Sequence, residues 1–294
     1  MKELSVFNIQ RFCHQDGKGL RTVIFLSGCP LNCKWCHNPE GKKIESQLLF
    51  YPNKCMNCQS CATYSCHVHQ FSEGNHFVDY KKCNSCNQCV FSCPANALEL
   101  TNKKMTIDEI IQVALKDYSF YGDDGGITLS GGEPTMQIDG LLELLKKAKE
   151  YKMNVAMETC GYFPEHYLLQ FVNYVDTFLW DVKDCQKERH LNNTGVDNQI
   201  ILSNLKKADQ LNFKIRLRCI LLHGINCNQE HANFLLQLAK SLKNIEGIDL
   251  IFYHPEGKNK YSFLGLENNF DHSSYIPTIE DIALFKATLK EYIK

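Results

Sequence analysis

Several features that would assign this chain to a common class of protein are missing from its sequence. The formal net charge is -1, so the charge balance gives no reason to expect nucleic acid or an anionic membrane surface as a partner. No apolar run reaches the roughly 18 residues of a membrane-spanning helix. The first residues lack the pattern of a secretory signal peptide, and we therefore expect a cytoplasmic protein.

One cysteine run has only three of the four cysteines that usually bind an iron–sulfur cluster. Cys29, Cys33 and Cys36 form a C-x3-C-x2-C run with three thiols only. A [4Fe–4S] cluster contains four irons, and proteins usually ligate all of them through cysteine. Three cysteine ligands leave one iron open, which indicates chemistry at the cluster rather than electron storage alone.

Cysteine itself is abundant. The chain has 16 cysteines, many for a reducing compartment, where structural disulfides are rare. Eleven of them gather in three groups, at 29–36, 55–66 and 83–93, and we interpret these groups as metal ligands. We interpret the remaining five as small buried hydrophobic residues: Cys13, Cys160, Cys185, Cys219 and Cys227.

Short apolar runs alternate with amphipathic stretches along most of the chain. This pattern predicts a first strand at 23–26 and a helix at 107–115 with Thr106 as its N-cap. The same pattern predicts further strands at 126–130, 155–159, 177–182, 215–222 and 249–254, and helices at 141–151, 165–174, 200–211, 230–242 and 279–292. Six βα units in series imply an α/β fold with a parallel sheet, either doubly wound or a partial barrel.

The segment 51–100 lacks this alternating pattern of strands and helices, and it carries eight of the cysteines. We interpret it as a small domain inserted into a larger one formed by 1–50 and 101–294. Its second cysteine run matches the bacterial ferredoxin pattern, and its first run has one extra residue. Because the fourth cysteine of each ferredoxin run crosses to the other cluster, we expect one cluster on Cys55, Cys58, Cys61 and Cys93, and another on Cys83, Cys86, Cys89 and Cys66.

Other metal groups could use parts of these motifs. Paired C-x2-C units also build zinc ribbons, although a third cysteine at the next x2 step is unusual for zinc. Cys33-Lys-Trp-Cys36-His37 spells the attachment pattern of c-type haem, and His37 could also complete a zinc site. Haem attachment requires export and leaves Cys29 unexplained, so iron–sulfur clusters are favoured.

The cysteine run after a first strand resembles that of the radical S-adenosylmethionine (SAM) enzymes. The flanking motifs at 16–22, 25–30 and 36–40 are similar to those of the glycyl radical enzyme activating enzymes, and the resemblance covers most of the chain. It implies a partial (β/α)6 TIM-like barrel of the radical SAM type with an inserted ferredoxin-like domain. It also implies that SAM binds the open iron and is reductively cleaved to methionine and a 5′-deoxyadenosyl radical. That radical removes a hydrogen atom from one glycine of a partner enzyme.

The resemblance also assigns residues to SAM. Gly131, Gly132 and Glu133 match the family motif for the SAM amino group, and the Glu133 carboxylate offers an acceptor for an ammonium. Lys183 is expected near the SAM carboxylate as a point charge, with Asp181 beside it. The ribose and adenine are expected to contact Trp35, His37 and His254.

Three further assignments follow from the same resemblance. Glu158, Thr159 and Asp181 match positions that can line a monovalent cation site, although Glu158 stands where the best-known pattern has Asp. Asp16 and Arg218 are expected to face the active site, with Asp16 near the incoming glycine peptide. Lys18 replaces the usual proline of that loop, which predicts a less rigid loop.

The sequence therefore predicts an oxygen-sensitive activating enzyme with three [4Fe–4S] clusters and SAM. Its expected partners are a glycyl radical enzyme and a flavodoxin or ferredoxin as electron donor, and we expect a monomer with no nucleic-acid or membrane partner. One alternative is a radical SAM peptide-modifying enzyme, a class that usually carries its extra cysteines after the barrel. A ferredoxin-like electron carrier is another alternative, but it leaves Cys29, Cys33 and Cys36 unexplained.

Overall fold

Eight strands form the main sheet of the computed structural model, which describes residues 2–63 and 67–293. The order along the sheet is β12-β11-β10-β9-β8-β2-β1-β7, and the six strands from β12 to β2 run parallel. The parallel α/β sheet predicted from the sequence is therefore confirmed. The strands are β1 (Glu3–Cys13), β2 (Arg21–Leu26), β7 (Lys103–Thr106), β8 (Gly126–Gly131), β9 (Asn154–Thr159), β10 (Thr177–Asp181), β11 (Lys214–Leu221) and β12 (Ile245–Phe252).

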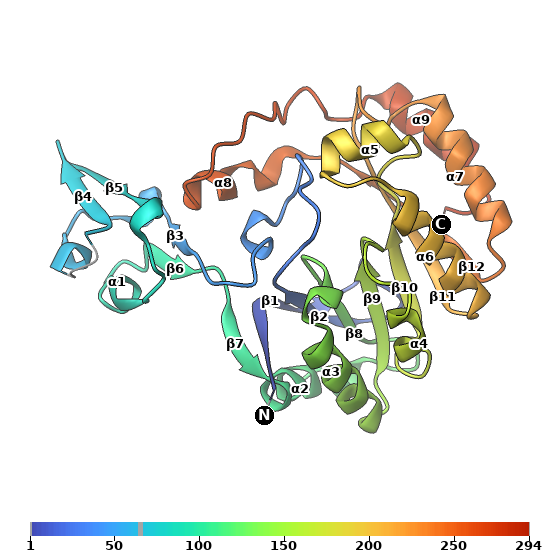
Figure 1. Cartoon of the computed structure of the whole chain (residues 1–294), viewed down its shortest axis with the longest axis horizontal. Coiled ribbons are helices and arrows are strands. Elements are labelled where there is room, and N and C mark those ends of the chain that lie inside the picture. Colours follow the sequence, from blue (N-terminus) through green and yellow to red (C-terminus); the bar gives the residue numbers. More distant parts are fainter. Residues whose placement is uncertain (1, 64–66, 294) are drawn as a thin grey trace.

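Helices cover the outer face of this sheet (Figure 1). Thr106 caps α2 as predicted, since its hydroxyl accepts from the Glu109 amide and the Glu109 carboxylate accepts from the Thr106 amide. Helix α4 is shorter than predicted, and the sequence pattern did not indicate α5 or α8. The helices are α2 (Ile107–Leu115), α3 (Ile138–Glu150), α4 (Tyr167–Phe171), α5 (Lys187–Thr194), α6 (Gln199–Gln210), α7 (Gln229–Ser241), α8 (Asn259–Phe263) and α9 (Ile279–Thr288).

Two antiparallel strands at one edge of the sheet were not predicted. Strand β1 pairs with β2, where Val6 lies opposite Leu26, and with β7, where Leu4 lies opposite Met105. Leu4 and Val6 are buried, but most of the remaining β1 residues are partly or fully exposed. Such short buried stretches carry a weak periodic signal, so their pairing depends on the rest of the sheet.

Successive side chains on the parallel strands point to opposite faces of the sheet, because a strand has a period of two residues. Ile127 and Leu129 on β8, and Phe178 and Trp180 on β10, pack into the core beneath the helices. Each fully buried side chain of this kind contributes about 1.5–3 kcal/mol to folding. The alternate residues face inward and are largely polar, so the inner face of the sheet leaves room for a polar ligand.

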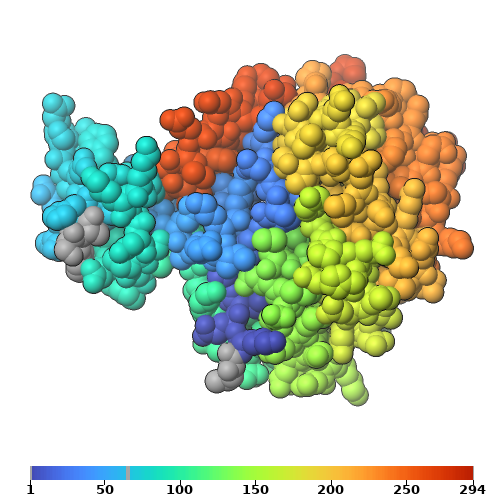
Figure 2. Space-filling view, viewed as in Figure 1, coloured from blue at the N-terminus to red at the C-terminus, as the bar shows by residue number. Residues whose placement is uncertain are grey.

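The cysteine-rich insert forms a separate lobe beside the barrel (Figure 2). Strands β3 (Leu48–Phe50) and β6 (Leu98–Leu100) pair antiparallel at its base. The lobe also contains a hairpin, β4 (His69–Ser72) and β5 (Asn75–Val78), and the short helix α1 (Gln88–Phe91). It has its own small apolar core, built from Leu48, Phe50, Val68, Ala97 and Leu98 together with cysteines.

Candidate active site

A cavity of about 280 Å³ lies on the inner face of the sheet, towards the carboxyl ends of the parallel strands. Its wall combines the cysteine loop after β2 with residues of β8, β9, β10, β11 and β12 and of the loops that follow them. Parallel α/β proteins bind their ligands at this end of the sheet. Sequence-predicted residues in the wall are Asp16, Cys29, Cys33, Trp35, Cys36, His37, Gly131, Gly132, Glu158, Thr159, Asp181, Lys183, Arg218 and His254.

The loop that carries Cys29, Cys33 and Cys36 is held by backbone hydrogen bonds. The amides of Asn32 and Lys34 donate to carbonyl oxygens at the end of α5, at 2.6 and 3.0 Å. Burial raises the pKa of Cys33 to about 12 and also raises the pKa of Cys36. Buried thiols of this kind ionise when they coordinate a metal. Cys29, Cys33 and Cys36 on one wall therefore fit an iron–sulfur cluster with three cysteine ligands.

Gly131 and Gly132 bring the end of β8 against the cysteine loop. The Gly132 amide donates to the Leu26 carbonyl at 2.8 Å, and the Glu133 amide donates to the Gly28 carbonyl at 2.6 Å. A Cβ atom on Gly131 would lie 2.2 Å from the Leu26 oxygen, and one on Gly132 would lie 2.2 Å from the Gly28 oxygen. Only glycine allows this approach, which places the strand end and the cysteine loop on adjoining walls of the cavity.

Glu133 requires a correction. Its side chain is fully buried and does not line the cavity. The carboxylate accepts hydrogen bonds from the Thr135 hydroxyl at 2.9 Å, the Thr159 hydroxyl at 2.9 Å and the Cys160 amide at 2.8 Å. Burial raises the pKa of Glu133, while these hydrogen bonds favour its charged form. The expected role as acceptor for the SAM ammonium does not fit this geometry, because the carboxylate instead ties together the ends of β8 and β9.

Lys183 and Asp181 form a buried ion pair at the end of β10, with 2.7 Å between Nζ and Oδ2. Burial by itself lowers the pKa of Lys183, but the negative charge of Asp181 outweighs burial and raises it. The Asn226 amide fixes the backbone here by donating to the Lys183 carbonyl at 2.8 Å. The cavity therefore has a fixed positive charge in its wall, which suits a carboxylate ligand.

The three expected ligands of a monovalent cation line the cavity, and each has a partner within the protein. Glu158 is paired with Arg218 at 3.2 Å, and the Thr159 hydroxyl donates to Glu133. Asp181 is engaged by Lys183. These oxygens therefore already have cationic or hydrogen-bonding partners in the protein, and the cation stays a prediction.

Arg218 joins two carboxylates from distant parts of the chain. Its Nη1 atom lies 3.3 Å from Asp16 and 3.2 Å from Glu158. Burial by itself lowers the pKa of Arg218, but the neighbouring carboxylates outweigh burial and raise it. Asp16 and Arg218 both lie in the cavity wall, as expected. Their contact with each other, across 202 residues of sequence, was not predicted.

The loop that carries Asp16 is fixed by contacts of its backbone. The Thr128 hydroxyl donates to the Asp16 carbonyl at 2.6 Å, and the buried Arg21 donates to the Lys18 carbonyl at 3.1 Å. Lys18 also forms an ion pair with Glu246 at 2.9 Å. These contacts anchor the loop without the proline that Lys18 replaces.

Three rings form one part of the cavity wall. Trp35 is buried, and the rings of His37 and His254 meet edge to face with 4.5 Å between their centroids. Burial, reinforced by His254, lowers the pKa of His37 and keeps the ring neutral. A wall of aromatic rings suits the flat face of an adenine.

Cys160 lies in the same wall, although its sequence position suggested only a packing residue. It is buried directly after β9 and lines the cavity. A hydrogen bond from the Cys160 thiol lowers the pKa of Cys29. The sequence did contain a feature that indicates a role in the site: Cys160 directly follows Thr159 at a strand end, where residues that face a ligand are common.

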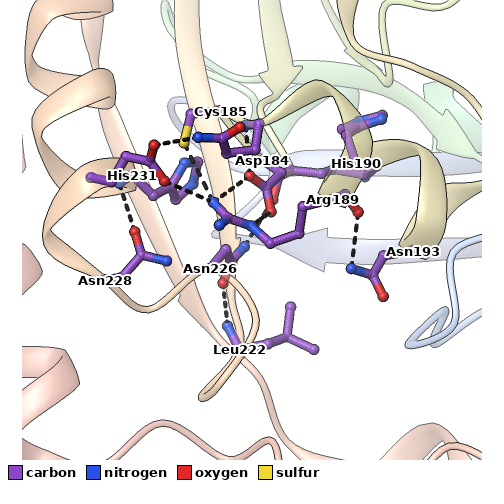
Figure 3. A network of polar contacts seen from close by, with 12 residues as sticks. Asp184, Cys185, Arg189, His190, Asn193, Leu222, Asn226, Asn228 and His231 are labelled. Atoms are coloured by element: carbon purple, nitrogen blue, oxygen red, sulfur yellow. Dashed lines mark hydrogen bonds and ion pairs between the residues drawn. The ribbon is translucent and has the colours of Figure 1, made fainter.

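The loop after Lys183 is anchored by a polar network around Asp184 (Figure 3). Arg189 donates to both carboxylate oxygens of Asp184, at 2.6 and 2.7 Å, and lies 3.5 Å from the Cys185 sulfur. His231 is buried beside the same cluster. Because the guanidinium already supplies the positive charge, we interpret this network as a structural anchor rather than a metal site.

In the insert, the fourth cysteine of the second run meets the first three of the other run. Cys55, Cys58, Cys61 and Cys93 line one small cavity together with His76. This arrangement fits a cluster whose fourth ligand crosses between runs. Cys66, the expected fourth ligand of the second cluster, lies outside the described residues.

Two family models match overlapping parts of the chain. The family model described as the Radical SAM superfamily matches residues 78–235, which is more than half of the chain. A second model, described as a 4Fe-4S single cluster domain, matches residues 15–82 and includes Cys29, Cys33 and Cys36.

Two relatives resemble the chain over almost its whole length. The choline trimethylamine-lyase activating enzyme of Oleidesulfovibrio alaskensis is 37% identical, over 98% of this chain and 95% of the relative. The 4-hydroxyphenylacetate decarboxylase activating enzyme of Clostridium scatologenes is 36% identical, over 94% and 90%. The chain belongs to the glycyl radical enzyme activating enzymes. It is therefore a radical SAM enzyme that uses SAM and an iron–sulfur cluster to activate a glycyl radical enzyme.

A solved structure supports the fold of this activating enzyme. Streptococcus suis SuiB bound to precursor peptide SuiA matches with a TM-score of 0.52 and 12% identity, over 85% of this chain and 42% of SuiB. The sheet and its covering helices are thus those of the radical SAM partial barrel. Among the residues that the structure describes, no helix has the length and apolar character needed to cross a membrane.

Proposed function

We propose that this activating enzyme carries three [4Fe–4S] clusters, one on Cys29, Cys33 and Cys36 and two in the insert. The proposal for the first cluster depends on one observation: three cysteine thiols, a glycine-rich strand end and the Lys183 charge all line one cavity. The shared cavity of Cys55, Cys58, Cys61 and Cys93 supports the proposed ligand crossing in the insert. We assign the inserted domain to 51–100; its strand β6 pairs with β3, which directly precedes the domain in the sequence.

The residues of the cavity have distinct proposed roles towards SAM. When bound and reduced, a cluster of this type supplies the electron that breaks a C–S bond of SAM. Lys183 holds the SAM carboxylate, and the backbone at Gly131 and Gly132 receives the amino group in place of the Glu133 side chain. The rings of Trp35, His37 and His254 flank the adenine and ribose. Fixed positions lower the entropic cost of bringing the reacting atoms together.

We assign Asp16 and Arg218 to the incoming glycine segment. Arg218 holds Asp16 in the cavity wall through the 3.3 Å ion pair, and the backbone contacts of the Asp16 loop restrict it further. A fixed carboxylate can accept a hydrogen bond from a backbone amide of the partner. This pair therefore positions the peptide rather than transferring a proton.

The electron donor proposed for this enzyme is a flavodoxin or ferredoxin, which would reduce the clusters of the protruding lobe first. We further propose a monomeric, cytoplasmic enzyme. Clustered thiol ligands are kept reduced in a cytoplasmic environment.

Anaerobic turnover tests the proposed function. The fully loaded enzyme, reduced with dithionite, is expected to cleave SAM to 5′-deoxyadenosine and methionine. With its partner enzyme present, it should also produce a glycine-centred doublet in the electron paramagnetic resonance (EPR) spectrum. A loaded protein that never cleaves SAM would instead support the electron-carrier interpretation.

Iron analysis of paired variants tests the ligand crossing. Cys93→Ala should remove the same cluster as Cys55→Ala, so each single variant and the double variant should all lose about four of about twelve irons. The double variant Cys83→Ala/Cys93→Ala should lose about eight irons, because its two substitutions fall on different clusters. Iron per chain and the EPR signals of the reduced protein give the measurement.

Cys13→Ala serves as the matched control, since Cys13 lies on β1 away from the three cysteine groups. It should leave the iron content unchanged. The opposite pattern, with four irons lost from Cys83→Ala/Cys93→Ala and eight from Cys55→Ala/Cys93→Ala, would mean that each run keeps its own fourth ligand.

A further inference from the structure

Two histidines of the insert hairpin meet beside the shared cysteine cavity. His76, on β5, places Nδ1 at 3.4 Å from the Cys55 sulfur and Nε2 at 3.9 Å from the Cys61 sulfur. His69, on β4, places its Nδ1 at 3.0 Å from Nε2 of His76. His69 and His76 thus form a pair, and His76 contacts two proposed ligands of one cluster, Cys55 and Cys61.

The His76 ring is held firmly in this position. It stacks on Phe71 with 4.4 Å between centroids and an interplanar angle of 17°, and Phe50 packs against it at 4.3 Å. His69 is buried, and its other ring nitrogen, Nε2, has no hydrogen-bond partner among the described residues. The only described polar partner of the buried His69 ring is therefore His76.

The order of donors along this chain follows from the chemistry of the ligands. A cysteine that binds iron is a thiolate, which can accept a hydrogen bond but cannot donate one. The Nδ1 contact with Cys55, at 3.4 Å, is shorter than the Nε2 contact with Cys61, at 3.9 Å, so we place the proton of His76 on Nδ1, which donates to Cys55. The Nε2 atom of His76 is then unprotonated, and it accepts a hydrogen bond from Nδ1–H of His69. The unpartnered Nε2 of His69 is then the unprotonated nitrogen.

We propose that His76, oriented by His69, donates a hydrogen bond to the Cys55 thiolate and thereby raises the reduction potential of the insert cluster bound by Cys55. Taking up one electron makes the cluster and its thiolates more negative, so a donor at sulfur stabilises the reduced state more than the oxidised state. His76 is a positioning residue that acts through Cys55. The inference rests on the proposed insert clusters and concerns how easily one of them accepts an electron.

The test is an EPR-monitored redox titration of the full chain. Replacing Cys29, Cys33 and Cys36 with alanine in every protein compared leaves the two insert clusters as the only signals. In that background, His76→Phe retains an aromatic ring between Phe50 and Phe71 but removes the donor. The equilibrium constant for reducing one cluster should fall at least tenfold, which for one electron is about 59 mV towards negative potential. The second cluster should keep its potential.

Three comparisons make the result specific. His76→Asn returns an N–H donor and should recover most of the shift, whereas His69→Phe should give a smaller shift of the same sign. His166→Phe, an exposed histidine on the barrel, is the matched control and should change nothing. In the unsubstituted His76 protein, ¹⁵N-histidine labelling should give a weak nitrogen hyperfine coupling, as a hydrogen bond to sulfur would.

Iron and zinc analysis distinguishes two outcomes: a wrong role for His76, and a wrong assignment of the insert cluster itself. About eight irons in the triple-alanine background with unchanged potentials in His76→Phe would overturn the role of His76 alone. A strong nitrogen coupling would make His76 an iron ligand and would also overturn it. About four irons with one zinc would mean that Cys61, His69 and His76 bind zinc, and the insert cluster itself would be rejected.

Discussion

Replacing Arg218 with methionine is expected to abolish formation of the glycyl radical and to destabilise the fold by about 3–5 kcal/mol. The guanidinium is buried between Asp16 and Glu158, at 3.3 and 3.2 Å. Methionine fills similar volume but leaves both carboxylates without their cation. Removing one partner of a buried ion pair costs far more than removing an exposed one, because the remaining charge stays desolvated. The urea midpoint of the loaded protein and the glycine-centred EPR signal give the two measurements.

The pH dependence of Arg218→Met distinguishes this cause from a general packing defect. Burial raises the pKa of Glu158, and Arg218 partly opposes that rise. Without Arg218 the pKa of Glu158 should rise further. A carboxyl with a raised folded pKa contributes stability at low pH and loses it as pH increases through that pKa. The deficit of the variant should therefore be larger at pH 8 than at pH 6.

Two further variants control this result. Arg218→Met/Glu158→Gln removes one of the two carboxylates that the loss of Arg218 leaves without a cation, and it should recover part of the lost stability. Arg216→Met, on the same strand, breaks a pair with Asp249 that is more exposed, and should cost less. A deficit that does not change between pH 6 and pH 8, with no recovery in the double variant, would contradict the electrostatic explanation.

Replacing Lys183 with methionine is expected to weaken SAM binding ten- to a hundredfold while every cluster is retained. The ammonium is buried in the cavity wall and carries a charge that suits the SAM carboxylate. A hydrogen bond to a charged group contributes about 1.5–3 kcal/mol, which corresponds to that range of affinity. Iron per chain and the change in the EPR spectrum of the reduced cluster on titration with SAM are the measurements.

The controls for Lys183 separate charge from fold. Lys183→Arg keeps the positive charge next to Asp181 and should lose less affinity than Lys183→Met. Lys187→Met removes an exposed lysine whose ion pair with Asp197 is 3.7 Å long, and SAM affinity should not change. Unchanged SAM affinity in Lys183→Met with intact clusters would remove Lys183 from the proposed SAM site.

Local sequence patterns were sufficient for much of the barrel. Strand β9 and helix α2 lie where the sequence predicts them, because β9 is a short apolar run that is mostly buried and α2 buries one face with the period of a helix. Strands β1 and β7 were missed because their buried faces are short and their partners lie elsewhere in the sequence. Helix α5 was missed for a similar reason, since only His190 and Thr194 of its residues are buried.

The sequence by itself determined the ligand spacing at Cys29, Cys33 and Cys36, the two ferredoxin-like runs and the motifs that mark the family. Only the tertiary structure decided where side chains point and which partners they find. It turned Glu133 away from the cavity, placed Arg218 against Asp16 and set His76 beside Cys55. The physical reason is that ligand spacing and periodicity are local properties of the chain. A buried charge or hydrogen-bond donor is instead satisfied by whichever strand or loop folding packs against it.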